Sequence, residues 1–317
     1  MTKALITGIT GSGASYLAEH LLDVGVEVHG IARWHSTSVP RNIAHIKDKI
    51  TVHECDLNDL SNTIRVLRTV KPDYIFHLAA HANVRVCFDT PIAVLQNNIN
   101  ITINLFEALR ILALDPVVQF CGTSEVYGIV AQEDTPITEE QKLDPVNIYA
   151  VSKLTQEKIA SSYFHAYGMK VVITRMFAYL NPRREDIFSS AFAKKVVEVE
   201  KGKRNVVTHG NLNSVRTLID VRDAMESYWV ASQKCDYGVP YNIGGHTIIS
   251  VGNFLQLLKE QASCDIPSEV DPSLLRPVDV TLQVPDVTLF TDKTGWKPKK
   301  SFEDSVEFLL NHYRNIV

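Results

Sequence analysis

The sequence of this chain predicts an α/β protein built on a doubly wound parallel sheet, followed by a smaller α/β region. In the first half, short apolar runs alternate with amphipathic helical patterns, which is the order expected of βαβ units with right-handed crossovers. The apolar runs are almost continuous, as expected for strands covered by helices on both faces of a sheet. After about residue 177 the alternation loosens, so we expect the second region to begin there.

The first 177 residues predict six strands and the helices that connect them. Ser61 is a candidate N-cap, because its hydroxyl can accept from the first N–H groups of a helix. Gly168 is the expected end of the last of these helices. The strands are expected at residues 3–7, 27–32, 50–56, 72–80, 117–124 and 170–177. The helices are expected at residues 15–25, 61–70, 94–112 and 147–168.

The rest of the chain is less regular. Residues 181–186 and 210–217 are polar and predict loops, and residues 239–245 predict a strand that returns to the main sheet. Later helices are expected at residues 220–232, 250–262 and 302–316. The resulting division is a first domain of residues 1–177 with about 218–244, and a second domain of residues 178–217 and 245–317.

Composition argues against several classes of protein. The net charge of −4 provides no basic field that would gather nucleic acid, and no apolar run is long enough to span a bilayer. The N-terminus leads directly into an apolar run without the pattern of a secretory signal. The five cysteines are scattered and include no C-x-x-C pair, so neither a metal site nor a disulfide framework is expected. We therefore expect a reduced, soluble, cytoplasmic protein.

A glycine-rich turn joins the first strand to the first helix. Gly8, Gly11 and Ala14 meet the spacing G-x-x-G-x-x-A, and Gly13 is an additional glycine. Gly8 permits the turn, Gly11 lets the backbone approach a pyrophosphate, and the helix N-terminus presents unpaired N–H groups to that anion. A turn of this kind also occurs without a ligand. Because strand–helix alternation continues after it, we interpret it as the phosphate-binding turn of a Rossmann-type dinucleotide site.

The residues after the second strand favour NADP over NAD. An NAD site usually has an acidic side chain there, which accepts from the ribose 2′-hydroxyl. This chain has Arg33 instead, with Ser36 and Thr37 nearby, and a guanidinium with hydroxyls suits a 2′-phosphate. NAD stays open as the alternative, in which Arg33 is a surface charge. Asp56, at the end of the third strand, fits either an adenine contact or a turn.

The spacing of Tyr149 and Lys153 predicts an acid/base pair. The two residues are four apart on an expected helix, so they share one face. A neighbouring ammonium and a nicotinamide cation would lower the pKa of the phenol, which is about 10 when free. Thr123, after the fifth strand, offers a hydroxyl to a substrate alcohol or carbonyl. The pattern Y-x-x-x-K alone is common by chance. Here it occurs at the expected place in the chain, after the glycine turn and four further predicted strands.

These motifs together resemble the extended short-chain dehydrogenase/reductase family over essentially the whole chain. Within it, the sequence is most similar to the GDP-mannose 4,6-dehydratases and the GDP-6-deoxy-4-keto-mannose reductases. The segments that carry the resemblance are LITGITGSGASYLAEHLL, VHGIAR, HLAAHANV, TSEVYG, YAVSK, NPRRE, GNLNSVR, LLRPVDV and TGWKP.

The resemblance implies a set of site residues. Thr123, Tyr149 and Lys153 would be catalytic, with Glu125 as the base of a dehydratase, and residues 77–80 would line the cofactor. The implied cofactor-binding residues are Gly8, Thr10, Gly11, Ser12, Gly13, Arg33, Asp56, Leu57, Leu78, Ala79, Ala80, Tyr149 and Lys153. The implied substrate-binding residues are His81, Thr123, Ser124, Arg216 and Arg276, the two arginines gripping the nucleotide diphosphate.

Several residues depart from the family pattern. Ala178 stands where the family usually has Asn, Thr217 replaces an acidic residue after Arg216, Ala82 replaces a frequent serine, and the segment after residue 184 lacks the usual basic residue. The substrate pocket has therefore changed, and the sugar need not be mannose. The N-terminal half is more similar to the dehydratases and the C-terminal half to the reductases.

Three functions are consistent with these residues. The first is a nucleotide-sugar 4,6-dehydratase acting on a GDP-hexose through a 4-keto intermediate. It needs Glu125 as a base, and if residues 123–125 are extended, Thr123 and Glu125 point to the same side. The second is a 4-keto-sugar reductase or a C4 dehydrogenase/epimerase that uses the same Thr–Tyr–Lys set. The third is a non-catalytic NAD(P)-binding protein. The resemblance also implies a homodimer or homotetramer, since helices at residues 94–112 and 149–164 often form a dimer bundle in this family.

Overall fold

The computed structural model describes residues 1–33, 40–275 and 277–317. Its main element is a parallel sheet of seven strands in the order β10-β6-β5-β4-β1-β2-β3, which confirms the predicted fold class. The strands are β1 (Lys3–Thr7), β2 (Glu27–Ala32), β3 (Thr51–Glu54), β4 (Tyr74–His77), β5 (Val117–Cys121), β6 (Val171–Met176) and β10 (Pro240–Ile243).

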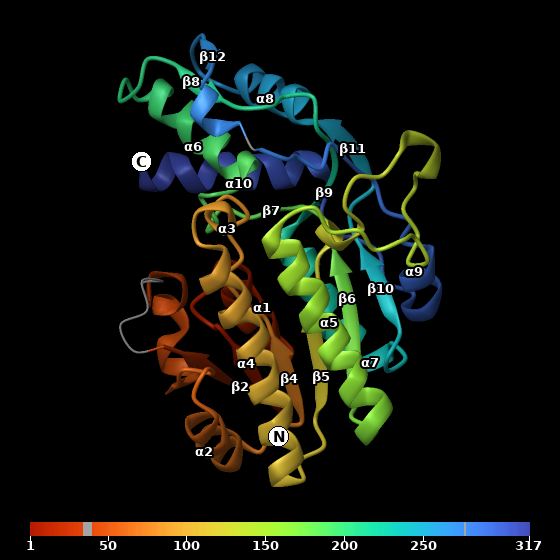
Figure 1. Cartoon of the computed structure of the whole chain (residues 1–317). Helices are drawn as coiled ribbons and strands as arrows, with labels where there is room; N and C mark the ends of the chain where they lie inside the picture. The colour runs from red at the N-terminus through yellow and green to blue at the C-terminus, as the bar shows by residue number, and fades with distance from the viewer. Residues whose placement is uncertain (34–39, 276) are drawn as a thin grey trace.

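Helices cover both faces of this sheet, and Figure 1 shows α4 and α5 in front of it. Successive residues of β1 face different cores: Leu5 packs with Leu67 of α2 and Leu105 of α4, whereas Ile6 belongs to the core of α1 and α7. This double coverage accounts for the continuous apolar runs of the strands. The helices are α1 (Ser12–Asp23), α2 (Leu60–Val70), α3 (Val86–Asp89), α4 (Pro91–Leu112), α5 (Ile148–Tyr167) and α7 (Val221–Lys234).

The second region lies over the carboxyl ends of the main strands (Figure 1). Its core joins Phe192, Leu255 and Leu309, which come from three different helices. The helices are α6 (Phe188–Glu200), α8 (Val251–Glu260) and α10 (Phe302–Ile316), and α9 (Thr288–Thr294) packs beside α7. Its strands are β7 (Tyr179–Leu180), β8 (Val207–His209), β9 (Val215–Asp220), β11 (Thr247–Ser250), β12 (Ser268–Val270) and β13 (Leu282–Gln283). Short 3₁₀ segments are η1 (Pro40–Lys49), η2 (Ser124–Tyr127), η3 (Gln132–Asp134) and η4 (Pro272–Leu274).

Most expected elements are present, and two local predictions are wrong. The returning strand is confirmed, because β10 pairs with β6 in parallel. Ser61 is not the N-cap of α2: Asp59 is, and its carboxylate accepts from the backbone N–H groups of Ser61 and Asn62. Residues 210–217 are not wholly a loop, since β9 begins at Val215 and pairs with β11 and β13. Among the described residues, no helix is both long and apolar enough to cross a membrane.

Candidate active site

One cavity of about 520 Å³ lies at the carboxyl ends of the main strands. The segments that follow β1 to β6 line it from below, and residues of the second region close it from above. All predicted site residues within the described part of the chain, with the exception of His77, line this cavity. These residues are Gly8, Thr10, Gly11, Ser12, Gly13, Arg33, Asp56, Leu57, Leu78, Ala79, Ala80, His81, Thr123, Ser124, Glu125, Tyr149, Lys153 and Arg216. Arg276, Ser36 and Thr37 lie outside the described residues.

The turn between β1 and α1 leaves little room for a side chain at its two glycines, Gly8 and Gly11. Gly8 adopts φ +71°, and a Cβ built on it would lie 3.1 Å from the Cα of Ala79. α1 begins after Gly11, which provides no side-chain cap, so the first N–H groups of the helix are available to an anion in the cavity. The additional Gly13 has a packing reason, because a Cβ there would lie 3.2 Å from Oη of Tyr179.

Arg33 and His81 line another part of the cavity. Arg33 is exposed. Burial, and then the charge of Arg33, lower the pKa of His81, so the two side chains are electrostatic neighbours. Asp56 lines the cavity and also makes a turn, since its Oδ1 accepts from the backbone N–H of Asn58 at 2.9 Å. The two interpretations of Asp56 are therefore compatible.

The segment at residues 77–80 only partly faces the cavity. Leu78, Ala79 and Ala80 line it, but the expectation for His77 is wrong. His77 is 1% exposed, and its two ring nitrogens lie 3.0 Å from the hydroxyls of Thr7 and Thr102. Since strand side chains alternate in direction, the last residue of β4 packs inward and the cavity begins one residue later.

Tyr149 and Lys153 lie one helical turn apart on α5 and both line the cavity. Burial raises the pKa of Tyr149, while the charge of Arg184 and a hydrogen bond with Thr123 lower it. Arg184 is thus a cation near this phenol that the spacing of Tyr149 and Lys153 does not predict. Burial lowers the pKa of Lys153, whose Nζ lies 4.6 Å from the centroid of the Phe120 ring.

Glu125 reaches the cavity from a tight turn and not from an extended segment. Thr123 caps η2, because its hydroxyl accepts from the backbone N–H of Glu125 at 3.3 Å, and this contact bends the chain. The condition that residues 123–125 are extended is therefore not met, although both side chains still line one cavity. Asn147 donates to Oε2 of Glu125 at 3.0 Å, and Gln283 donates to Oε1 at 3.5 Å.

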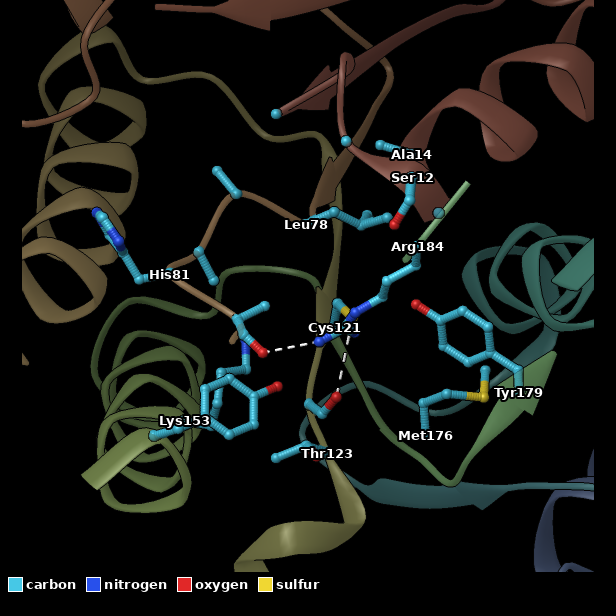
Figure 2. Close-up of a pocket in the computed structure, with 18 of the residues that line it drawn as sticks. Ser12, Ala14, Leu78, His81, Cys121, Thr123, Lys153, Met176, Tyr179 and Arg184 are labelled. Atoms are coloured by element: carbon cyan, nitrogen blue, oxygen red, sulfur yellow. Dashed lines mark hydrogen bonds between the residues drawn. The ribbon is translucent and has the colours of Figure 1, made fainter. Parts of the chain in front are cut away.

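Arg184 and Gln283 are among the polar residues of the cavity that were not predicted from the sequence. Arg184 extends into the cavity toward the end of β5 (Figure 2), where it donates to the carbonyl of Ala82 at 2.8 Å. The neighbouring Arg183 instead pairs with Glu19 at 2.6 Å. The segment NPRRE could have indicated one functional arginine, but not which of the two. Gln283 belongs to no motif that we recognised, and only the pairing of β13 with β9 brings it here.

The second region contributes polar groups to the opposite wall. Arg216 is 8% exposed, and its guanidinium donates to the carbonyls of Val215 and Val280, so it is buried in the wall of the cavity and not a solvated surface charge. α6 begins after Ile187 without a side-chain cap. Ser189, in its first turn, lines the cavity, and its buried Oγ has no hydrogen-bond partner among the described residues. Both features leave donors available to an anion.

Comparison with known proteins identifies the family. The model of a family described as GDP-mannose 4,6 dehydratase matches residues 5–309. The chain belongs to this family. A GDP-mannose 4,6-dehydratase of Yersinia enterocolitica is 30% identical over 342 residues, which cover 96% of this chain and 91% of that protein. The predicted membership of the extended short-chain dehydrogenase/reductases is confirmed.

Solved structures of the same fold extend over the whole chain. The UDP-glucose 4-epimerase of Thermus thermophilus, in complex with NAD, is 26% identical with a TM-score of 0.88 and covers 100% of both chains. The protein titled RMD from Pseudomonas aeruginosa, complexed with NADPH, is 24% identical with a TM-score of 0.87 and also covers 100% of both chains. This second likeness concerns the fold alone.

Proposed function

We propose that this chain is an NAD(P)-dependent nucleotide-sugar 4,6-dehydratase that acts on a GDP-hexose. One observation carries the proposal: a single cavity joins a dinucleotide-type turn, the Thr123–Tyr149–Lys153 set and a carboxylate, Glu125, held by two side-chain amides. The family match and the dehydratase relatives support the same activity.

The residues of the first wall fit a dinucleotide. The turn at Gly8 leaves space for a pyrophosphate against the N–H groups of α1, and Leu78, Ala79 and Ala80 provide an apolar surface. A nicotinamide held against these residues would supply the hydride acceptor for C4 of the sugar and the hydride donor for C6. NADP is the preferred form in this proposal because Arg33 lines the cavity where an NAD site usually has an acid.

The residues of the opposite wall fit the diphosphate of a nucleotide sugar. Among the described residues, the Ser189 hydroxyl has no hydrogen-bond partner and the N-terminus of α6 has no side-chain cap, and Arg216 adds positive charge to the same cavity. Arg276, from the family resemblance, is part of the proposal for the same group. His81 and Ser124 are proposed to contact the sugar.

Tyr149, Thr123 and Glu125 then move the protons of the reaction. Tyr149 takes the proton of the C4 hydroxyl, and the Thr123 hydroxyl donates to that oxygen as it becomes a ketone. The 4-ketone makes the C5 proton acidic. Glu125 removes it, and the C6 hydroxyl leaves as water. Lys153 holds positive charge beside the phenol and the cofactor.

The assembly, domain division and location complete the proposal. A homodimer or homotetramer through α4 and α5 is supported by exposed apolar side chains there, including Ile103 and Ile111 on α4 and Tyr167 on α5. Residues 1–177 with about 218–244 would hold the cofactor, and residues 178–217 with 245–317 the nucleotide sugar. A cytoplasmic location remains the expectation that the scattered cysteines support.

The decisive experiment asks whether water is lost. Incubated with GDP-mannose in deuterated solvent and without added NADPH, the wild type should release a dehydrated 4-keto product carrying deuterium at C5. Glu125→Gln should still oxidise C4, visible as the absorbance of reduced cofactor, and stall before elimination. A wild type that yields no dehydrated product here, but consumes added NADPH stoichiometrically with a GDP-4-keto-6-deoxy-sugar, would instead be a 4-keto-sugar reductase.

A panel of GDP-, CDP-, UDP- and dTDP-sugars, scored by product mass, then assigns the base and the sugar. Turnover confined to another base would overturn the assignment of GDP while leaving the dehydratase chemistry in place.

A further inference from the structure

The carboxylate of Glu125 is held from two sides by amides that come from distant parts of the chain. Asn147 is the N-cap of α5, and its Nδ2 donates to Oε2 at 3.0 Å. Gln283 lies on β13 in the second region, and its Nε2 lies 3.5 Å from Oε1. The two oxygens therefore have different environments.

The orientation of the Asn147 amide is fixed by its role as a cap. Its Oδ1 accepts from the backbone N–H of Ala150 at 2.8 Å, so Nδ2 must point the other way, toward Glu125. An oxygen that faces a fixed N–H donor is a poor site for a proton, because the proton and the donor would compete for the same space. A proton taken up by Glu125 is thus directed to Oε1.

The Gln283 amide faces that oxygen and does not cap a helix. Gln283 is 4% exposed and lines the cavity. A glutamine amide carries two N–H donors and one carbonyl acceptor. It can therefore donate to Oε1 while the group is a carboxylate, and after rotation of the amide it can accept from the Oε1 hydroxyl of the acid.

We propose that Gln283 is the positioning residue for the proton transfer at C5, and that Oε1 of Glu125 is the oxygen that carries the proton. This inference rests on the dehydratase function proposed above. In the step, the C5–H bond breaks and an O–H bond forms at Oε1. The electron pair forms the C5–C6 double bond, and the C6 hydroxyl leaves as water with that proton.

The position of Gln283 also links the catalytic base to the nucleotide. Gln283 is the register partner of Arg216 in the parallel pairing of β13 with β9. Both side chains line the cavity. A nucleotide sugar bound at Arg216 therefore fixes the strand pair that presents Gln283 to Glu125, so binding energy from the distant diphosphate orders the reacting carboxylate.

The test separates C4 oxidation from C5 proton removal in Gln283→Leu. In single turnovers with GDP-mannose in deuterated solvent, the rate of cofactor reduction should stay within about threefold of wild type, and KM likewise. Deuterium incorporation at C5 should slow by about 10- to 100-fold, the usual effect of a misplaced catalytic group, and reduced cofactor should accumulate. Gln256→Leu, the same substitution on an exposed face of α8, is the matched control and should alter neither step.

Gln283→Glu provides a second readout and keeps the side chain polar and of the same size if the leucine variant does not fold. A second carboxylate beside Glu125 disfavours the ionised base, so the acidic limb of the pH profile of C5 exchange should move to higher pH. A merely structural role would leave that limb in place. Equal slowing of both steps in Gln283→Leu, or exchange at the wild-type rate, would overturn the assignment of Gln283 while wild-type dehydration still stands. A wild type that forms no dehydrated product would overturn the proposed function itself.

Discussion

At the scale of single residues, Tyr149 and Lys153 have separable roles. Burial raises the pKa of the Tyr149 phenol, and Lys153 is 3% exposed beside it on the same helix face. Tyr149→Phe removes only the acid/base hydroxyl, so we expect turnover to fall by about 10²- to 10⁴-fold while cofactor affinity changes little. Lys153→Ala should weaken both. Single-turnover rates and cofactor titrations measure the two effects, and a Tyr149→Phe enzyme within a few-fold of wild type would contradict the assignment.

We expect Arg33 to decide the choice between NADP and NAD. It is exposed and lines the cavity near His81, so its guanidinium is available to a 2′-phosphate. We expect the wild type to bind NADP more tightly than NAD, and Arg33→Ala to lose most of this preference with little change for NAD. Equilibrium titrations with both nucleotides measure it. Equal wild-type affinities would show that Arg33 is only a surface charge.

At the scale of elements, Asp59 and not Ser61 caps the N-terminus of α2. The Asp59 carboxylate accepts from two backbone N–H groups at the start of α2, at 2.9 and 3.2 Å, whereas Ser61 donates its hydroxyl to Asp59. Asp59→Ala should lower the melting temperature by about 1–3 °C, as expected for a lost cap in a chain of this size. Ser61→Ala is the matched control, and a larger loss there would restore Ser61 as the more important residue of this terminus.

Among the helices and strands, the longer ones could be predicted from the sequence and the two-residue strands could not. Long apolar strands and capped helices such as α5, which ends at Gly168 with φ +67°, carry local signals. β13 has two residues and β7 has two, too few for a periodic pattern, and their place depends on pairing with β9. The motif residues of the site were predictable because they lie in short segments, such as TSEVYG and YAVSK, whose resemblance to the family implies their roles. Gln283 was not, because its contact with Glu125 spans residues far apart in the sequence.

At the scale of the whole molecule, His77 joins the sheet to its covering helices. The Thr102 hydroxyl donates to the carbonyl of Asn98 at 3.1 Å, so it accepts from Nε2–H of His77. The Thr7 hydroxyl accepts from the N–H of Ala79 at 3.0 Å, which leaves its proton for Nδ1 of His77. The neutral imidazole with its proton on Nε2 therefore donates to Thr102 on α4 and accepts from Thr7 on β1. An imidazolium would also carry a proton on Nδ1, so two donors would face each other at Thr7.

This network makes global stability depend on pH. Burial, and then the charge of Lys153, lower the pKa of His77 from 6.5 to about 3. The unfolded chain therefore binds a proton at His77 below pH 6.5 that the folded chain does not bind. The stability from the neutral imidazole is complete above pH 6.5 and is lost as the pH falls toward 3, by about 1.4 kcal/mol per pH unit for one proton.

His77→Gln, which has no ionisable group, should be less stable at pH 8 by about 1–3 kcal/mol through altered buried hydrogen bonds. Its free energy of unfolding in urea should then decline less steeply than that of wild type between pH 6 and pH 4.5. The other histidines titrate in both proteins and cancel in the difference. If the unfolding free energies of wild type and His77→Gln differ by the same amount from pH 8 to pH 4.5, His77 does not contribute to the pH dependence of stability.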